Sequence, residues 1–205
     1  MTKFTKYCTN TDMHATVILP GGCNAHCSFC YDVSGHEDIE NYKEKLSEIY
    51  KRIRTHNVHK MAITGMETTL SPYFLDALAV ARDSGYDFRF LNTNGTAVLK
   101  YINEINSSLD AINISRHALT DEENYKIFGT TSVPSTDLLK EITRRLSIPV
   151  NMNFVALDSD PEKSKKIFQM ADYYLTAFGL HGDACKHVIS CVFVFRCHCF
   201  MSSRA

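Results

Sequence analysis

The sequence lacks a strong net charge and lacks any long hydrophobic run. Its 22 lysine and arginine residues balance 23 aspartate and glutamate residues, so the formal net charge is −1 at pH 7. A nearly neutral chain offers no extended field for a polyanion, which argues against broad nucleic-acid binding. The longest apolar stretches, residues 15–19 and 188–195, fall well short of the roughly 20 residues that a membrane helix needs. We therefore expect no membrane span.

Signals that would divide or export the chain are also absent. There is no internal repeat, no low-complexity tract and no linker rich in proline, glycine and serine. The first ten residues contain no apolar core of signal-peptide length, which predicts a cytoplasmic protein. A length of 205 residues with 44% hydrophobic and 22% charged residues suits one globular domain.

Cysteine is well represented, with eight residues. Three of them, Cys23, Cys27 and Cys30, lie within eight residues of sequence. Four more crowd the C-terminal end, at Cys185, Cys191, Cys197 and Cys199. In a reducing compartment, a tight group of cysteines more often binds metal or performs redox chemistry than forms disulfides.

Short β-branched segments alternate with amphipathic segments along the chain. We expect strands at residues 15–19, 60–64, 88–91, 111–115 and 150–157, with 188–195 as a candidate sixth strand. Helices are expected over residues 38–56, 71–84, 96–105, 134–146 and 160–178. This alternation predicts parallel βαβ units, and it fits an open doubly wound sheet as well as a partial barrel.

The motif with the most chemical content is Cys23-Asn-Ala-His-Cys27-Ser-Phe-Cys30, directly after the first expected strand. Three thiolates in one loop can converge on one metal centre, and thiolates favour zinc or iron–sulfur clusters. A cubane cluster has four irons, so three cysteines leave one iron open to a chelating small molecule. The alternative is a structural zinc site completed by His26 or His36, although the second, separated ligand pair usual in such sites is absent nearby.

The C-x3-C-x-aromatic-C pattern, with Phe29 before the last cysteine, resembles the cluster loop of the radical S-adenosylmethionine (SAM) enzymes. The resemblance extends to about Leu157. It implies that Cys23, Cys27 and Cys30 hold a [4Fe–4S] cluster whose fourth iron is chelated by SAM. It also implies an α/β fold, a partial parallel (β/α)6 barrel whose last unit can be incomplete. We expect a core domain over residues 1–178 and a cysteine-rich tail over 179–205.

Two later segments resemble SAM-binding and turn segments of the same family. Gly65-Met66-Glu67 follows the second expected strand, where the family has Gly-Gly-Glu and its backbone carbonyls accept hydrogen bonds from the SAM amino group. Met66 departs from that pattern by adding bulk and restricting φ. The alternative interpretation of Gly65 is an ordinary glycine that ends a strand. Residues 92–96 resemble the family's Thr-Asn-Gly turn, which we interpret as architectural.

Polar residues also end the fourth and fifth expected strands. The resemblance implies a hydroxyl contact from Ser115 to SAM and a pairing of Arg116 with the SAM carboxylate. Asn153 is a further candidate for the ribose, and His117 is a candidate either to face substrate or to lie on the surface. Most of these residues fall at the carboxyl ends of strands, the face where parallel barrels build active sites.

The resemblance therefore implies an enzyme with a [4Fe–4S] cluster and SAM as cofactors, which takes hydrogen from a substrate that the sequence does not specify. It also implies an electron donor such as a flavodoxin or ferredoxin. Two alternatives stay open: a zinc-stabilised, non-catalytic binding module, and an inactive, truncated remnant of such an enzyme. The C-terminal cysteines, with the histidines near them, form either a second metal site or an altered tail of unbound thiols.

Overall fold

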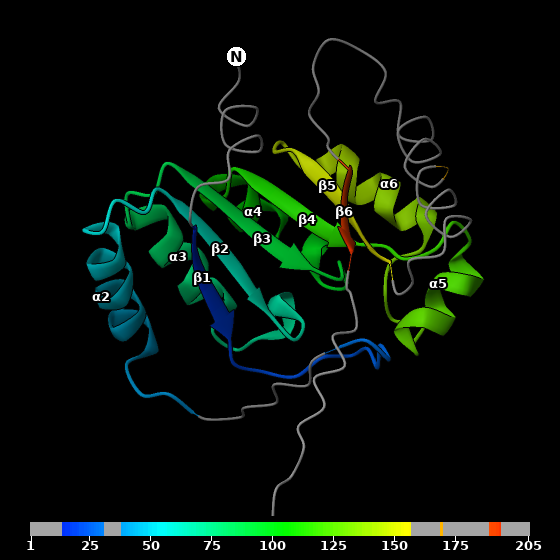
Figure 1. Cartoon of the computed structure of the whole chain (residues 1–205), viewed down its shortest axis with the longest axis horizontal. Helices are drawn as coiled ribbons and strands as arrows, with labels where there is room; N and C mark the ends of the chain where they lie inside the picture. The colour runs from blue at the N-terminus through cyan, green and yellow to red at the C-terminus, as the bar shows by residue number, and fades with distance from the viewer. Residues whose placement is uncertain (1–13, 31–37, 157–168, 170–188, 194–205) are drawn as a thin grey trace, which may run out of the picture.

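The computed structural model describes residues 14–30, 38–156, 169 and 189–193. These residues contain one sheet of six strands, in which every neighbouring pair is parallel and the spatial order follows the chain (Figure 1). The strands are β1 (His14–Leu19), β2 (Lys60–Gly65), β3 (Phe88–Thr93), β4 (Ala111–Ser115), β5 (Val150–Ala156) and β6 (Ile189–Phe193). The expected sixth strand is therefore present over a shorter span.

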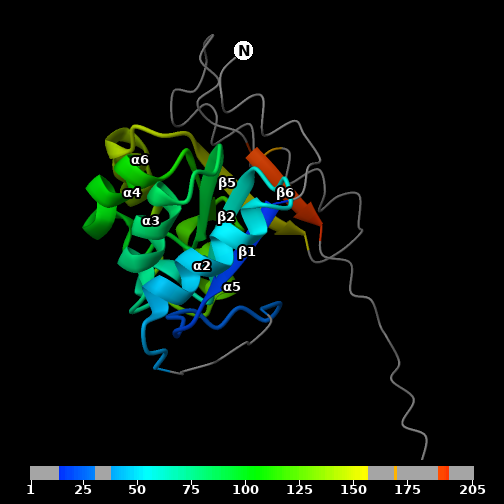
Figure 2. The ribbon, with the colours of Figure 1, turned by 90° about the vertical axis from the view of Figure 1, so that its left-hand side faces the viewer.

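Helices follow the strands as crossover connections. They are α2 (Tyr42–Arg54), α3 (Phe74–Asp83), α4 (Ile102–Ser108), α5 (Asp121–Phe128) and α6 (Thr136–Arg145), with 3-10 turns η1 (Thr68–Leu70) and η2 (Val98–Tyr101). Helices α3, α4 and α6 lie on the same side of the sheet (Figure 2). A doubly wound sheet reverses its strand order and carries helices on both faces. Sequential order with one covered face is the geometry of a partial barrel, so the expected fold is confirmed.

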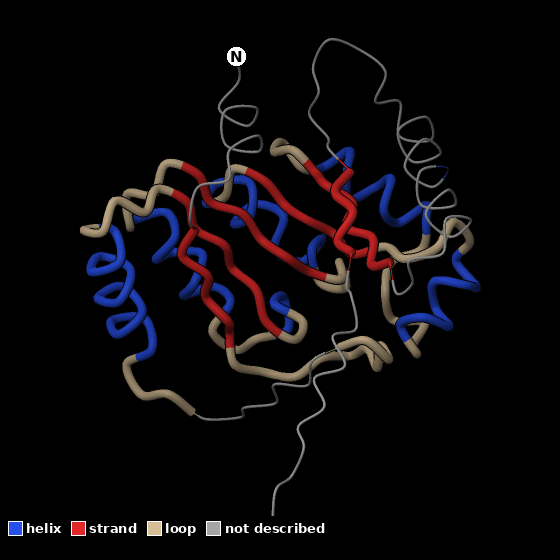
Figure 3. Tube along the Cα trace, in the orientation of Figure 1, coloured by secondary structure: helices blue, strands red, loops and turns tan. Residues whose placement is uncertain are grey.

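The core lies between the sheet and its helices. One row of apolar side chains crosses the strands in register, from Ile63 through Leu91 and Ile112 to Val150, and all four are buried. Phe74 at the start of α3 belongs to the same buried cluster. Figure 3 shows the strands as one layer with the helices behind it. Alternation of side chains along each strand leaves the opposite face for other residues.

That opposite face carries a row of three asparagines. Asn92, Asn113 and Asn151 stand in register on β3, β4 and β5. Asn113 Nδ2 donates to Asn92 Oδ1, and Asn151 Nδ2 donates to Asn113 Oδ1, each at 2.7 Å. The three side-chain amides thus serve as hydrogen-bond partners for one another, which polar groups within a sheet require. The face turned away from the helices is therefore polar in its middle.

The structure differs from the sequence-based expectation at two helices. The expected helix over 96–105 begins as the 3-10 turn η2 and becomes α-helical only at Ile102. Helix α5 was not expected at all, although Thr120 caps it by accepting a hydrogen bond from the backbone N–H of Glu123. Apart from residue 169, the helix expected over 160–178 lies outside the described residues, as do Cys185, Cys197 and Cys199, whereas Cys191 lies in β6 opposite Phe154. Among the residues described, no helix combines the length and apolar character that a membrane crossing requires.

Candidate active site

The three cysteines lie in one loop, residues 20–30, which we call the cysteine loop. It follows β1 directly and runs past the carboxyl ends of the neighbouring strands toward α5 (Figure 1). The backbone N–H of Cys30 donates to the carbonyl of Cys27 at 3.0 Å, which closes a turn between them. The backbone N–H of Ala25 donates to Cys23 Sγ at 3.3 Å. The order of the strands thus places all three thiols at one end of the sheet.

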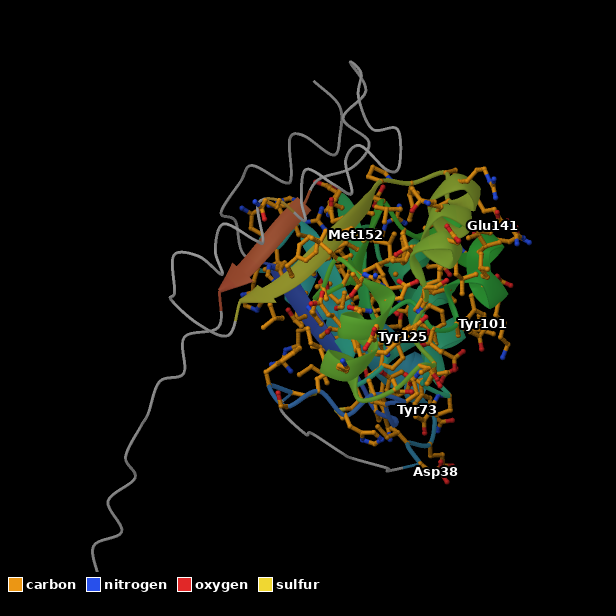
Figure 4. All side chains as sticks on the ribbon, turned by 90° about the vertical axis from the view of Figure 1, so that its right-hand side faces the viewer. Asp38, Tyr73, Tyr101, Tyr125, Glu141 and Met152 are labelled. Carbon is orange, nitrogen blue, oxygen red and sulfur yellow. The ribbon has the colours of Figure 1, made fainter. Side chains whose placement is uncertain are left out.

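Helix α5 holds the far side of the cysteine loop (Figure 4, where Tyr125 marks this helix). The backbone N–H of His26 donates to the carbonyl of Phe128 at 2.7 Å. Gly129 then ends the helix with φ +64°, and a Cβ on it would meet His26 Cβ at 3.2 Å. Only glycine takes this conformation and this approach without strain. These contacts with α5 were not expected from the sequence, although the Thr120 to Glu123 spacing and Gly129 were signals for the helix.

The electrostatics of the three thiols fit a shared cationic group. Burial, and then the charges of Cys30 and Cys23, raise the pKa of Cys27 to about 11. Burial is also the main cause that raises the pKa of Cys23, with Glu67 and Cys30 adding to it. Thiolates close enough to repel one another are stabilised by a cation bound between them, and that binding releases their protons. The residues present therefore fit an iron–sulfur cluster with three thiolate ligands.

The described residues show no preformed site for a single metal ion. In the described part of the chain, no three histidine, cysteine, aspartate or glutamate side chains are arranged to hold one metal ion. A zinc site needs its thiolate sulfurs about 2.3 Å from one metal. His36, one of the two expected partners of such a site, lies outside the described residues.

The segment Gly65–Glu67 continues β2 beside the cysteine loop. Gly65 pairs with Leu19, and a Cβ at Gly65 would lie only 2.9 Å from the Leu19 carbonyl oxygen. The close approach of two backbones therefore requires glycine here. The backbone N–H of Glu67 donates to the carbonyl of Gly22 at 3.3 Å. Met66 is partly exposed between them.

The side chain of Glu67 is turned into the protein. It is 2% exposed, and its carboxylate accepts four hydrogen bonds. Thr69 donates from its backbone N–H at 3.0 Å and from its hydroxyl at 2.6 Å. Thr93 donates from its hydroxyl at 2.5 Å, and the backbone N–H of Asn94 donates at 2.6 Å. The Glu67 carboxylate is therefore committed to contacts within the protein, and Glu67 can offer a ligand only its backbone.

Ser115 and Asn153 are brought together. They stand opposite each other in the register of β4 and β5, both partly exposed, on the same face as the asparagine row. The backbone N–H of Arg116 donates to the carbonyl of Asn153 at 2.9 Å, which extends this pairing. Two of the candidate polar side chains thus lie side by side at the carboxyl end of the sheet.

Arg116 has a different role from the one expected. Its side chain is completely buried, and it donates to the carboxylate of Asp121 at 2.7 Å and to the hydroxyl of Thr136 at 3.1 Å. It also donates to backbone carbonyls of residues 118, 119 and 134. A guanidinium used in this way has no donor to offer an external carboxylate. The expected pairing of Arg116 with SAM is therefore corrected: Arg116 joins β4 to the starts of α5 and α6.

His117 is partly buried between two aromatic rings. Its ring centroid is 5.0 Å from that of Phe29 in the cysteine loop and 4.8 Å from that of Phe128. The backbone N–H of Val155 donates to His117 Nδ1 at 3.2 Å, so the ring proton of the neutral form is on Nε2. Burial, and then the charge of Arg116, lower the pKa of His117 to about 4. His117 is therefore a neutral packing partner of the cysteine loop at neutral pH.

This burial predicts a pH dependence of stability. In the unfolded chain His117 takes up a proton near pH 6.5, whereas in the folded chain it stays neutral down to about pH 4. The free energy of unfolding should therefore fall as the pH drops from 6.5 to 4, by about 3 kcal/mol from this group. Urea unfolding of the metal-free, reduced protein at several pH values measures it. A His117→Asn variant should lose this part of the slope, and an unchanged slope would contradict the assignment.

Comparisons with known proteins agree with this geometry. A family model described as the radical SAM superfamily matches residues 17–171. A probable GTP 3′,8-cyclase of Saccharolobus solfataricus is 27% identical over 160 residues, which cover 76% of this chain and 51% of the relative. A probable GTP 3′,8-cyclase of Metallosphaera sedula is 25% identical over 160 residues, covering 76% of this chain and 50% of the relative. The chain thus spans about half the length of these curated relatives.

Solved structures share the fold. Streptococcus suis SuiB bound to S-adenosylmethionine superposes with a TM-score of 0.62 at 12% identity, over 86% of this chain and 47% of SuiB. Methylornithine synthase (PylB) superposes with a TM-score of 0.60 at 13% identity, over 94% of this chain and 56% of that protein. At such low sequence identity the similarity concerns the fold alone. The shared fold is the partial barrel described above.

Proposed function

The chain belongs to the radical SAM superfamily, and on this premise we propose that it is a radical SAM enzyme whose [4Fe–4S] cluster is held by Cys23, Cys27 and Cys30. The observation that carries the proposal is the placement of these three thiols in one loop at the carboxyl end of β1, where the charges of Cys30 and Cys23 help to raise the pKa of Cys27. Members of this superfamily use such a cluster together with SAM, and they need a reductant and a substrate.

When bound, a cluster held by Cys23, Cys27 and Cys30 would supply the electron for reductive cleavage of SAM, the chemistry by which hydrogen would be taken from the substrate. The chain's own residues bind and orient SAM for this chemistry. In our proposal, the backbone carbonyls of the segment Gly65–Glu67 accept hydrogen bonds from the SAM amino group. Ser115 and Asn153, side by side on β4 and β5, hydrogen-bond the ribose.

The remaining parts of the proposal concern the whole enzyme. The electron comes from a partner such as a flavodoxin or a ferredoxin, because reductive cleavage of SAM requires one electron. Residues 1–178 form the core domain that binds both cofactors, and residues 179–205 form a cysteine-rich tail. The described helices and strands that carry the candidate site all lie within this core domain.

Removal of the Ser115 hydroxyl should weaken SAM binding without loss of the cluster. A Ser115→Ala variant should bind SAM with about fivefold lower affinity, the effect of one hydrogen bond worth about 1 kcal/mol. SAM titration of the reduced cluster, followed by electron paramagnetic resonance, measures the affinity. Ser107→Ala is the matched control, because the Ser107 hydroxyl donates within α4 to the Glu104 carbonyl. Equal affinities in all three proteins would remove Ser115 from the site.

Reconstitution with iron and sulfide under anaerobic conditions tests the proposed cofactors. We expect a brown protein with broad visible absorbance and four irons per chain, the content of one [4Fe–4S] cluster. SAM should then change the electron paramagnetic resonance spectrum of the reduced protein. A colourless protein that retains one zinc per chain would support the binding module instead. A cluster whose spectrum does not respond to SAM would contradict the chelation of SAM.

A further inference from the structure

Three side chains beside the cysteine loop form a closed ring of hydrogen bonds. Asn94 Nδ2 donates to Asn24 Oδ1 at 2.9 Å, Asn24 Nδ2 donates to Thr96 Oγ1 at 2.9 Å, and the Thr96 hydroxyl donates to Asn94 Oδ1 at 2.6 Å. The backbone N–H of Thr96 also donates to Asn94 Oδ1 at 3.0 Å, which fixes the orientation of this amide. Each member of the ring therefore donates once and accepts once, an arrangement in which the bonds strengthen one another.

The ring connects two segments that are far apart in the sequence. Asn24 follows Cys23 in the cysteine loop, whereas Asn94 and Thr96 belong to the turn after β3. The backbone N–H of Asn94 donates to the Glu67 carboxylate, so the same turn is bound to the end of β2. The ends of β1, β2 and β3 are thus joined at one point.

We propose that the ring of Asn24, Asn94 and Thr96 positions the cysteine loop against the segment Gly65–Glu67. This inference rests on the proposed function, because those are the two segments that would hold the cluster and the SAM amino group. The three ring residues act through the loop, so they are positioning residues. Their effect on SAM is to fix the distance between an open iron and the backbone carbonyls that receive the SAM amino group.

The other contacts of the loop explain why the ring matters most at Cys23. Before Cys23, the Gly22 carbonyl accepts a hydrogen bond from the Glu67 backbone N–H; toward its far end the loop is held by the His26 hydrogen bond to Phe128 and by the turn between Cys27 and Cys30. Asn24 is the residue of the loop that is joined through its side chain to the β3 turn. Loss of the ring would therefore leave Cys23 less well fixed while the sheet and its buried apolar row stay intact.

Substitution of Thr96 tests the proposal, because valine keeps the shape of the side chain and removes the hydroxyl. Thr96→Val should lower the SAM affinity of the reconstituted protein about tenfold, the effect of losing two ring hydrogen bonds, and should speed cluster loss to a chelator. Thr96→Ser, which restores a hydroxyl, should return both quantities close to those of the unsubstituted protein. Thr143→Val is the matched control, since the Thr143 hydroxyl donates to the Leu139 carbonyl within α6.

A second readout needs no cluster and separates this inference from the proposed function. In the metal-free, reduced protein, iodoacetamide should label Cys23 severalfold faster in Thr96→Val than in the unsubstituted protein or in Thr96→Ser, with mass spectrometry to locate the label. Asn24→Ala should behave like Thr96→Val, and it serves if Thr96→Val does not fold. Equal labelling rates would overturn the positioning role even if the cluster forms. If Cys23 is labelled faster in Thr96→Val but the unsubstituted protein forms no cluster on reconstitution, the proposed function is overturned. The positioning role of the ring then still holds.

Discussion

Replacement of Cys27 by alanine is expected to abolish the cluster and everything that depends on it. Cys27 lies between the other two ligands, within reach of the charges of both, and two thiolates cannot complete a three-cysteine site. After anaerobic reconstitution, the iron content of Cys27→Ala should stay at the background of untreated protein, and no 5′-deoxyadenosine should form. Iron analysis and visible absorbance measure the first quantity, and chromatography measures the second.

A matched control variant tests whether loss of the cluster is specific to Cys23, Cys27 and Cys30. Cys8 stands apart from the other cysteines in the sequence, so Cys8→Ala should take up iron like the unsubstituted protein. A fully loaded cluster in Cys27→Ala would show that another residue serves as the third ligand. In that case the assignment of Cys23, Cys27 and Cys30 would be wrong.

Replacement of Arg116 is expected to destabilise the fold rather than to weaken SAM binding selectively. An Arg116→Met variant leaves three backbone carbonyls without the Arg116 donor, and the Asp121 carboxylate keeps only its hydrogen bonds from Thr136. Because the guanidinium is completely buried, the free energy of unfolding should fall by about 3 kcal/mol or more. Urea unfolding of the metal-free protein measures the loss.

An exposed arginine provides the control for this substitution. Arg82 pairs with Asp83 on the surface of α3, where such pairs contribute little, so Arg82→Met should change the free energy of unfolding by less than about 0.5 kcal/mol. The alternative for Arg116 is that it binds the SAM carboxylate. Unchanged stability in Arg116→Met, together with a large loss of SAM affinity, would restore that alternative.

The alternation of strands and helices could be predicted from the sequence because its signals are local. Short β-branched runs such as residues 111–115 became buried strands with nearly the expected bounds. The choice between a doubly wound sheet and a partial barrel could not be made from that pattern, because both use the same βαβ units. Helix α5 was missed because it has only eight residues, too few for a clear apolar period, and its evidence lay in its caps.

The candidate site shows the same division. The cysteine triplet and the segment Gly65–Glu67 are contiguous motifs, and the sequence pointed to both. The role of Arg116 was misjudged because the residues that surround its guanidinium lie two to twenty positions further along the chain. The ring that includes Asn24 and Asn94 joins residues 70 positions apart, and only the folded sheet brings them together. Contiguous motifs could be predicted from the sequence, whereas hydrogen bonds between polar side chains that are distant in the sequence could not.

The formation of 5′-deoxyadenosine tests the central claim most directly. The reconstituted protein is incubated anaerobically with SAM and dithionite, with and without GTP, the substrate in the names of its curated relatives. We predict 5′-deoxyadenosine in amounts that require both SAM and the reductant, and none from the Cys27→Ala variant. A protein that carries a complete cluster, binds SAM and still releases no 5′-deoxyadenosine under any of these conditions would contradict the proposal that this chain is a radical SAM enzyme.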